Sequence, residues 1–213
     1  MAKRILSATG VRGMARSVYY SIRHAGRPDA FLLSKNSSIS LHPDADISIE
    51  NVLSLGVYHS DIMHHSLGGP RLQVHEGGSL TAQDGIPHIG PGSVVNVQGD
   101  FRSGDSYING QSRVFCKRSI TIGDGCSISW DVDILDSNGG HSLSVHSEDA
   151  DPDAPVSIGD DVWIGHGVTI LPGVSIGDNS IVAAKSLVNR DVPDNSLVGG
   201  IPAEVIYDSV SWD

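Results

Sequence analysis

The sequence between Ile158 and Val192 repeats with a fixed period of six residues. One phase of this repeat holds only isoleucine or valine, at Ile158, Ile164, Ile170, Ile176, Val182 and Val188. The positions four residues further on are all small or β-branched: Val162, Val168, Val174, Ser180, Ser186 and Val192. A helix repeats roughly every 3.6 residues and a strand every two, so neither element alone produces this period. The period predicts a solenoid, a parallel β-helix in which each short strand buries its face only when the next coil stacks on it.

A β-sandwich of short strands is the alternative, but its strands keep a less rigid spacing. In the predicted solenoid, three hexads form the three sides of one coil, and Gly-Asp or Gly-His turns the chain at the corners. The 25 glycines suit such tight corners. We therefore predict an all-β chain with a β-helix over residues 39–196, an N-terminal helical segment over 1–38 and a C-terminal tail over 197–213.

Residues 13–24 are predicted to form a short amphipathic helix. Ala15, Val18, Tyr19 and Ile22 share one face of it, and the arginines lie elsewhere. Such a helix packs on the solenoid or on a neighbouring subunit, or it makes weak contact with an anionic membrane surface. The sequence shows no apolar run of the length of a membrane span and no secretory signal, so we expect a cytoplasmic protein.

Charge is distributed unevenly along the chain, whose formal net charge is −11. Residues 1–35 hold seven lysines or arginines against one acidic residue, whereas the rest holds seven basic and 24 acidic residues. The acidic body argues against nucleic acid as a partner. Cys116 and Cys126 show no metal-binding or C-x-x-C spacing, and Cys126 falls at a small-residue position where it is expected to fill the core.

Four histidines gather where the repeat is least regular, at His59, His64, His65 and His75. A histidine cluster can bind a metal ion. No pair among these four has a helical i, i+4 spacing on a convincing helix, and no carboxylate partners are evident. We therefore predict exposed or corner histidines there, and no metal site in the chain.

The repeat is interrupted between Ser137 and Val156 by a segment rich in Asp, Ser, Gly and Pro. An extra segment between two well-phased coils must leave the solenoid as a loop, and such loops commonly carry function. This loop opens with Asp136-Ser-Asn-Gly-Gly-His141. His141 is either an exposed loop histidine or a general base, since a neutral imidazole with a pKa of about 6.5 is suited to accept a hydroxyl proton at neutral pH.

Three segments resemble the hexapeptide-repeat acyltransferases: Ile158-Gly-Asp-Asp-Val-Trp-Ile-Gly-His-Gly-Val-Thr-Ile-Leu-Pro-Gly-Val-Ser-Ile-Gly-Asp-Asn-Ser180, Asn189-Arg-Asp-Val-Pro193 and Gly199-Gly-Ile-Pro-Ala203. The resemblance covers about Ile108 to Ile206 and is strongest to the branch that O-acetylates sugars and polysaccharides. It implies a left-handed parallel β-helix, acetyl-CoA as co-substrate, and a sugar or polysaccharide hydroxyl as acceptor. It also implies a homotrimer with three sites, each between two subunits.

The same resemblance assigns roles on the acceptor side. His141 matches the catalytic histidine of the family, and Asn109 matches an asparagine that contacts the acceptor, with a corner asparagine as the alternative. Asp136 is placed with them as an acceptor contact. Lys117 and Arg118 depart from the acidic region of the galactoside and maltose branch, so they either favour an anionic acceptor or are surface charge.

On the cofactor side, the resemblance implies seven residues: Trp163, Gly165, His166, Ala183, Lys185, Arg190 and Pro202. Trp163 would line the tunnel for the pantetheine arm, or else pack on the next subunit. A backbone N–H near Gly165 or His166 would hold the oxyanion. Lys185 and Arg190 would reach the phosphates.

Two other functions are compatible with this fold. A γ-type carbonic anhydrase binds zinc through three histidines from two subunits, two of them five residues apart, as His141 and His146 are. Its third histidine would lie near residue 105, where the sequence has Asp105, and a zinc site needs three protein ligands. The other alternative is a non-catalytic trimeric scaffold, against which the retained His141, Trp163 and Ala183 argue.

Overall fold

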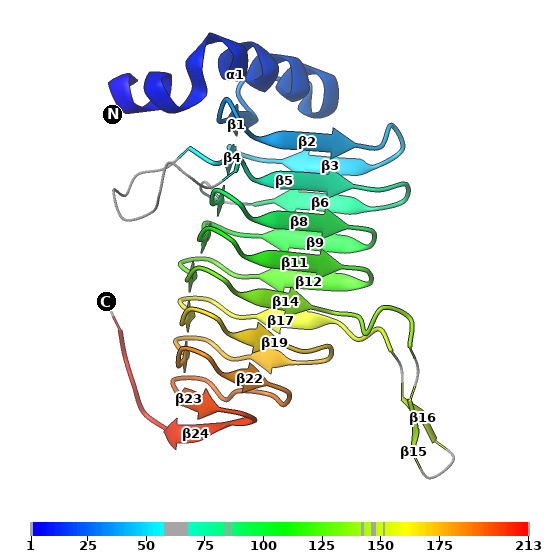
Figure 1. Cartoon of the computed structure of the whole chain (residues 1–213), viewed down its shortest axis with the longest axis vertical. Helices are drawn as coiled ribbons and strands as arrows, with labels where there is room; N and C mark the ends of the chain where they lie inside the picture. Colours follow the sequence, from blue (N-terminus) through cyan, green and yellow to red (C-terminus); the bar gives the residue numbers. More distant parts are fainter. Residues whose placement is uncertain are drawn as a thin grey trace.

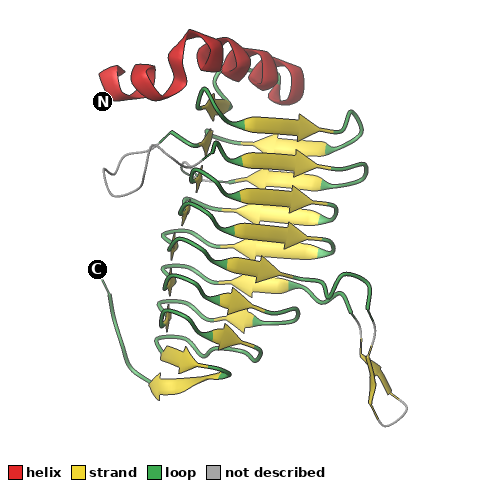
Figure 2. Cartoon of the chain, in the orientation of Figure 1, coloured by secondary structure: helices red, strands yellow, loops and turns green. Residues whose placement is uncertain are grey.

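The computed structural model describes residues 2–57, 68–83, 85, 87–141, 143–145, 148–150 and 152–212. The chain begins with one helix, α1 (Ala2–Ala25), and continues as a parallel β-helix with three faces (Figures 1 and 2). His59, His64, His65 and His146 lie outside the described residues, whereas His75 is exposed at a corner, as predicted.

The coils contribute their strands in turn to three sheets. The first sheet contains β1 (Phe31–Leu33), β4 (Leu53–Leu55), β7 (His88–Ile89), β10 (Tyr107–Ile108), β13 (Ser127–Ile128), β18 (Trp163–Ile164), β21 (Ile181–Val182), β23 (Leu197–Gly200) and the antiparallel β24 (Ala203–Tyr207). The second contains β2 (Ser38–Leu41), β5 (Arg71–Val74), β8 (Val94–Val97), β11 (Arg113–Cys116), β14 (Asp133–Leu135), β19 (Thr169–Ile170) and β22 (Leu187–Val188). The third contains β3 (Asp46–Ile49), β6 (Ser79–Ala82), β9 (Asp100–Ser103), β12 (Ser119–Ile122), β17 (Val156–Ile158) and β20 (Ser175–Ile176). We call the turns that follow strands of the first, second and third sheet corner 1, corner 2 and corner 3.

The predicted six-residue phase is confirmed by burial. All six isoleucines and valines of the phase are at most 3% exposed, and the small or β-branched residues four positions further on are buried with them. In these later coils strand partners are three hexads apart in the sequence, as in the pair Trp163 and Ile181. Earlier coils are longer than three hexads, as the pairing of Arg113 with Val94 on one side and with Asp133 on the other shows.

The solenoid strands extend beyond the predicted range of 39–196 at both ends. Strand β1 pairs in parallel with β4, so the first coil begins at Phe31. Strand β23 pairs in parallel with β21, so the last coil includes part of the predicted tail. The helix is also longer than the predicted residues 13–24, with a break in its helical backbone at Gly10.

Aspartates form a column along corner 3, where each carboxylate accepts the backbone N–H of the aspartate in the preceding coil. The column runs through Asp105, Asp124, Asp160, Asp178 and Asp194, with N···O distances of 2.7, 2.8, 2.8 and 3.1 Å. A Cβ on Gly159 would lie 2.1 Å from Oδ1 of Asp178. The Gly-Asp pair therefore recurs because the carboxylate of the next coil occupies the space beside the glycine.

Both cysteines are buried in the solenoid. Sγ of Cys126 donates to the carbonyl of Gly159 (3.0 Å), and Sγ of Cys116 to that of Asp100 (3.3 Å). Burial raises the pKa of Cys116 to about 12 and that of Cys126 to about 11. Both are therefore neutral thiols at physiological pH, and the prediction that Cys126 fills the core is confirmed.

The predicted extruded loop leaves the solenoid at corner 2, between β14 and β17 (Figure 1). Its outer part forms a hairpin of β15 (Leu143–Val145) and β16 (Glu148–Ala150). Val156 already belongs to the solenoid, where it is 1% exposed. The loop is thus an insertion within one coil, at the corner between its second and third strands, and His141 lies on it.

Candidate active site

The extruded loop starts at a buried carboxylate. Asp136 is 0% exposed, and its two oxygens accept the backbone N–H groups of Lys117 (2.8 Å), Arg118 (2.7 Å) and Ser119 (2.7 Å). These three amides form the corner-2 turn of the preceding coil. A carboxylate with this burial and these partners does not contact an acceptor from solution, which corrects the predicted role of Asp136. It instead fixes the start of the loop to the solenoid.

A second set of contacts closes the base of the loop. Asp153, at the returning end, accepts a hydrogen bond from Oγ of Ser137 (2.5 Å) and forms an ion pair with Nζ of Lys117 (2.8 Å). Arg118 donates to the carbonyl of Asp153 (2.8 Å). The hydrogen bond from Lys117, then that from Ser137, lowers the pKa of Asp153. The basic pair thus holds the loop base, and an anionic acceptor at this point would compete with Asp153.

His141 follows this base on the outward part of the loop. Its side chain is exposed, and its backbone N–H approaches the carbonyl of Asn138 at 3.5 Å. The two residues before it, Gly139 and Gly140, have φ values of 71° and 87°, a backbone region that favours glycine. The ammonium of Lys117 lies 3.9 Å from where a Cβ on Gly140 would be. His141 therefore projects from a glycine turn that the loop base supports.

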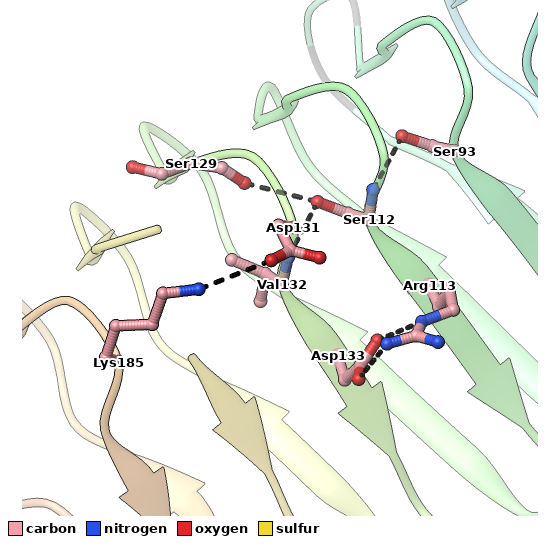
Figure 3. Close-up of polar contacts among 8 residues, drawn as sticks. All are labelled: Ser93, Ser112, Arg113, Ser129, Asp131, Val132, Asp133 and Lys185. Carbon is pink, nitrogen blue, oxygen red and sulfur yellow. Dashed lines mark hydrogen bonds and ion pairs between the residues drawn. The ribbon is translucent and has the colours of Figure 1, made fainter. Parts of the chain in front are cut away.

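Corner 1 holds a second group of predicted residues. His166 stacks on Trp130 of the preceding coil, with ring centroids 5.1 Å apart and planes 18° apart. The side chain of Lys185 passes over Gly167, so that a Cβ added to Gly167 would lie 2.3 Å from Nζ of Lys185. This Nζ lies 3.4 Å from Oδ2 of Asp131 (Figure 3). This corner therefore presents an aromatic stack beside an exposed cation.

At corner 1, serine hydroxyls form hydrogen bonds with backbone groups of the next coil. Oγ of Ser112 accepts the N–H of Val132 (3.2 Å) and donates to the carbonyl of Ser129 (3.2 Å), and Ser93 supports Ser112 in the same way (Figure 3). Asn109 lies at the same corner and accepts the N–H of Gly110 through its own Oδ1 (2.7 Å). That contact fits the alternative of a corner asparagine, and its predicted contact with an acceptor stays a prediction.

The amide of Gly165 is already used by the fold. It donates to the carbonyl of Val182 in the next coil (2.8 Å), so it is not available to an oxyanion. This leaves the amide of His166 as the candidate of the predicted pair. Ala183 is half-buried, and its backbone N–H donates to the carbonyl of Val198 (2.8 Å). The predicted cofactor contact of Ala183 stays a prediction.

Trp163 points outward from the first sheet and is 43% exposed. Its ring centroid lies 6.1 Å from that of Trp212, whose Nε1 donates to the carbonyl of Asp161 (2.7 Å). The C-terminal segment thus returns along the first sheet and covers part of Trp163. The sequence reasoning missed both Trp212 and Trp130. Trp130 follows Ile128 by two residues, as His166 follows Ile164, so the coil register was the signal that could have found it.

Arg190 and Pro202 lie at the C-terminal end of the solenoid. Arg190 is at corner 2 and lines a hollow together with Val198, Ala203 and Glu204. Pro202 is exposed in the turn between β23 and β24, and the Ile201-Pro202 peptide bond is cis. Because Lys185 is at corner 1, Lys185 and Arg190 of one chain do not face the same phosphate.

Within the described residues, no three of His, Cys, Asp or Glu gather as a metal site. Asp105, at the position where a zinc enzyme would need its third histidine, belongs to the aspartate column of corner 3. His141 lies at corner 2. One chain therefore brings the predicted site residues together in three groups. Lys117, Arg118 and His141 lie at corner 2, the group around His166 lies at corner 1, and Trp163 lies on the first sheet.

Proteins that are similar to this chain include named acetyltransferases. The family model "Bacterial transferase hexapeptide (six repeats)" matches residues 155–190. The galactoside O-acetyltransferase of Escherichia coli (strain K12) is 35% identical over 117 residues, which cover 54% of each protein. The putative lipopolysaccharide biosynthesis O-acetyl transferase WbbJ of the same strain is 36% identical over 115 residues, 50% of this chain and 59% of the relative.

A solved structure extends the match. The hexapeptide-repeat-containing acetyltransferase of Vibrio cholerae O1 biovar eltor, crystallised with acetyl coenzyme A, is 35% identical, with 60% of this chain and 70% of that chain covered and a TM-score of 0.53. The chain belongs to the hexapeptide-repeat acyltransferases. The predicted left-handed parallel β-helix is confirmed as its fold class. The chain spans a little over half the length of the two curated relatives from Escherichia coli.

Proposed function

We propose that this hexapeptide-repeat acyltransferase transfers an acetyl group from acetyl-CoA to a hydroxyl of a sugar or polysaccharide, with His141 as the general base. The observation that carries the proposal is the placement of His141. It is an exposed histidine on a loop inserted at corner 2 of one coil, five residues after the buried anchor Asp136. The two O-acetyl transferases of Escherichia coli and the acetyl-CoA complex from Vibrio cholerae support the reaction class.

The proposed chemistry is a direct transfer. Acetyl-CoA supplies the acyl group as a thioester. His141 accepts the proton of the acceptor hydroxyl as its oxygen attacks the thioester carbonyl, and the imidazolium returns a proton to the departing sulfur. A backbone N–H stabilises the oxyanion, and the amide of His166 is the candidate because that of Gly165 is bonded to Val182. Lys185, exposed at corner 1, is the proposed phosphate contact on that side.

The proposal includes a homotrimer whose sites are shared between subunits. His141 lies at corner 2, whereas His166, Ala183 and Lys185 lie at corner 1 of the same chain. A site that needs both groups is completed when corner 2 of one copy faces corner 1 of another. Three such contacts close a ring with threefold symmetry.

The test is the H141A variant, assayed by release of free CoA thiol with a panel of neutral and acidic sugars. We expect kcat to fall by about 10²–10⁴-fold, because the proton acceptor is lost. Acetyl-CoA affinity, measured by calorimetry, should stay unchanged because His141 is not among the proposed cofactor contacts. H42A is the matched control, since His42 is also exposed but pairs with Asp44 in the first coil. An H141A enzyme as active as H42A contradicts the role of His141.

A further inference from the structure

Helix α1 has an unusual distribution of side chains. The face that packs on the solenoid is small and polar, with Thr9, Gly13, Ser17 and Ser21 buried. The outward face is apolar, and its members are Val11 (83% exposed), Met14 (48%), Val18 (44%), Tyr19 (61%) and Ile22 (56%). Val11, Met14, Val18 and Ile22 recur every three or four residues, and Tyr19 lies three residues before Ile22, so the five form one continuous stripe along the helix. We call these five residues the outer stripe.

The inward face is polar because it completes the edge of a sheet. Strand β1 is the first strand of its sheet, so one of its edges has no neighbouring strand. Oγ of Ser21 accepts the N–H of Phe31 (2.8 Å), and Oγ of Ser17 accepts that of Leu33 (2.9 Å). Gly13 permits this approach, since a Cβ there would lie 2.8 Å from the carbonyl of Leu33. The polar face of the helix thus caps the free edge of β1, and the apolar residues of the helix face outward.

The cations near the outer stripe indicate what covers it. Arg12 and Arg23 are exposed along one side of the stripe, whereas Arg16 donates inward to the carbonyl of Ser37 (2.7 Å). Residues 1–35 hold seven basic residues and one acidic residue, and the rest of the chain holds seven and 24. The end of the molecule that carries the stripe is therefore cationic, and the body is strongly anionic.

We propose that the outer stripe and its arginines dock on an anionic lipid surface. An apolar helix face with a cationic rim lies in the plane of such an interface, with the apolar residues among the acyl chains and the cations at the headgroups. A second copy of the helix would instead bring arginines of the same charge together. Figure 1 shows α1 across one end of the solenoid, so docking leaves the acidic coils projecting away from the lipid (Figures 1 and 2). Within the described residues, no helix combines the length and apolarity needed to cross a bilayer.

The experiment is flotation of the full chain with vesicles, which does not depend on the proposed acetyl transfer. We expect binding to vesicles of phosphatidylglycerol and phosphatidylcholine, and little binding to phosphatidylcholine alone. Replacing Arg12 and Arg23 by Ser should weaken partitioning by about 25-fold, because each cation near an anionic surface contributes about fivefold. Replacing Val18 and Ile22 by Ser should weaken it at least about tenfold. Binding should also weaken as salt is raised.

Matched controls distinguish a specific docking face from nonspecific adsorption to the vesicles. R71S/R102S removes two exposed strand arginines from the acidic body, and V205S/I206S removes two exposed apolar residues at the other end of the solenoid. Both should bind vesicles as the wild type does. Equal losses in the control and helix variants would overturn the proposal, as would failure of the wild type to float. A change of oligomeric state in V18S/I22S, with no vesicle binding by the wild type, would show that the stripe pairs with a second copy instead.

Discussion

At the scale of single residues, Asp136 determines where the loop begins. Its carboxylate accepts three amides from the turn between β11 and β12. In D136N, one oxygen becomes an amino group that cannot accept these hydrogen bonds, so buried amides lose their partner. We expect the free energy of unfolding to fall by about 1–3 kcal/mol, measured by urea denaturation.

The matched control for D136N is D133N, three residues earlier at the start of β14. Asp133 pairs with Arg113 at the surface (Figure 3), where the arginine side chain is 63% exposed. Removing that pair should cost less than about 1 kcal/mol. If the loop base also positions His141, folded D136N should show a lower kcat with an unchanged KM for acetyl-CoA. Equal stabilities of D136N and D133N would show that the buried contacts contribute little.

The sequence predicts residue positions better than residue roles. His141 is an exposed loop residue, as predicted, because an interruption of a strict repeat has to leave the solenoid. Asp136 was assigned to the acceptor because the local sequence does not reveal the three amides that surround it, which come from the preceding coil. Trp212 was missed because it contacts Trp163 across 49 residues of sequence and lies outside the hexad pattern.

At the scale of elements, corner 3 depends on its Gly-Asp pairs. A Cβ on Gly159 would lie 2.1 Å from Oδ1 of Asp178, whose carboxylate receives the amide of Asp160. G159A therefore has to displace this carboxylate and weaken the stacking of two coils. We expect its free energy of unfolding to fall by about 1–3 kcal/mol, measured by thermal or urea unfolding. G68A, where nothing lies within 4 Å of the new Cβ, should be close to wild type.

The strands also show where the six-residue period predicts the pairing register and where it does not. The hexads predict the strands from β17 to β22, because strand partners there are three hexads apart. The last coil is shorter, since Val182 pairs with Val198, 16 residues later. Earlier coils have longer corners, so counting three hexads from Cys116 leads to Ile134. The strand register instead pairs Val114 with Ile134 and so places Cys116 beside Asp136. Register there is set by turn geometry, which the six-residue pattern does not encode.

At the scale of the whole molecule, the three-sided solenoid separates the two halves of the proposed site. His141 extends from corner 2, whereas Trp163 lies on the first sheet and Lys185 at corner 1. The stacked coils between them are filled with buried side chains, so one chain does not bring these residues together. A shared site between subunits follows from this geometry only if the chain assembles with threefold symmetry, and complementation between variants tests that arrangement directly.

The test combines H141A and W163A chains, co-expressed in equal amounts and assayed without separating mixed from single-variant oligomers. If each site takes His141 from one subunit and Trp163 from its neighbour, random assembly leaves about a quarter of the sites with both side chains. We expect about a quarter of wild-type activity at limiting acetyl-CoA, although each variant alone is nearly inactive. The matched control co-expresses wild type with the double variant H141A/W163A. A shared site again gives about a quarter, whereas a site within one chain gives about half and leaves the H141A and W163A mixture inactive.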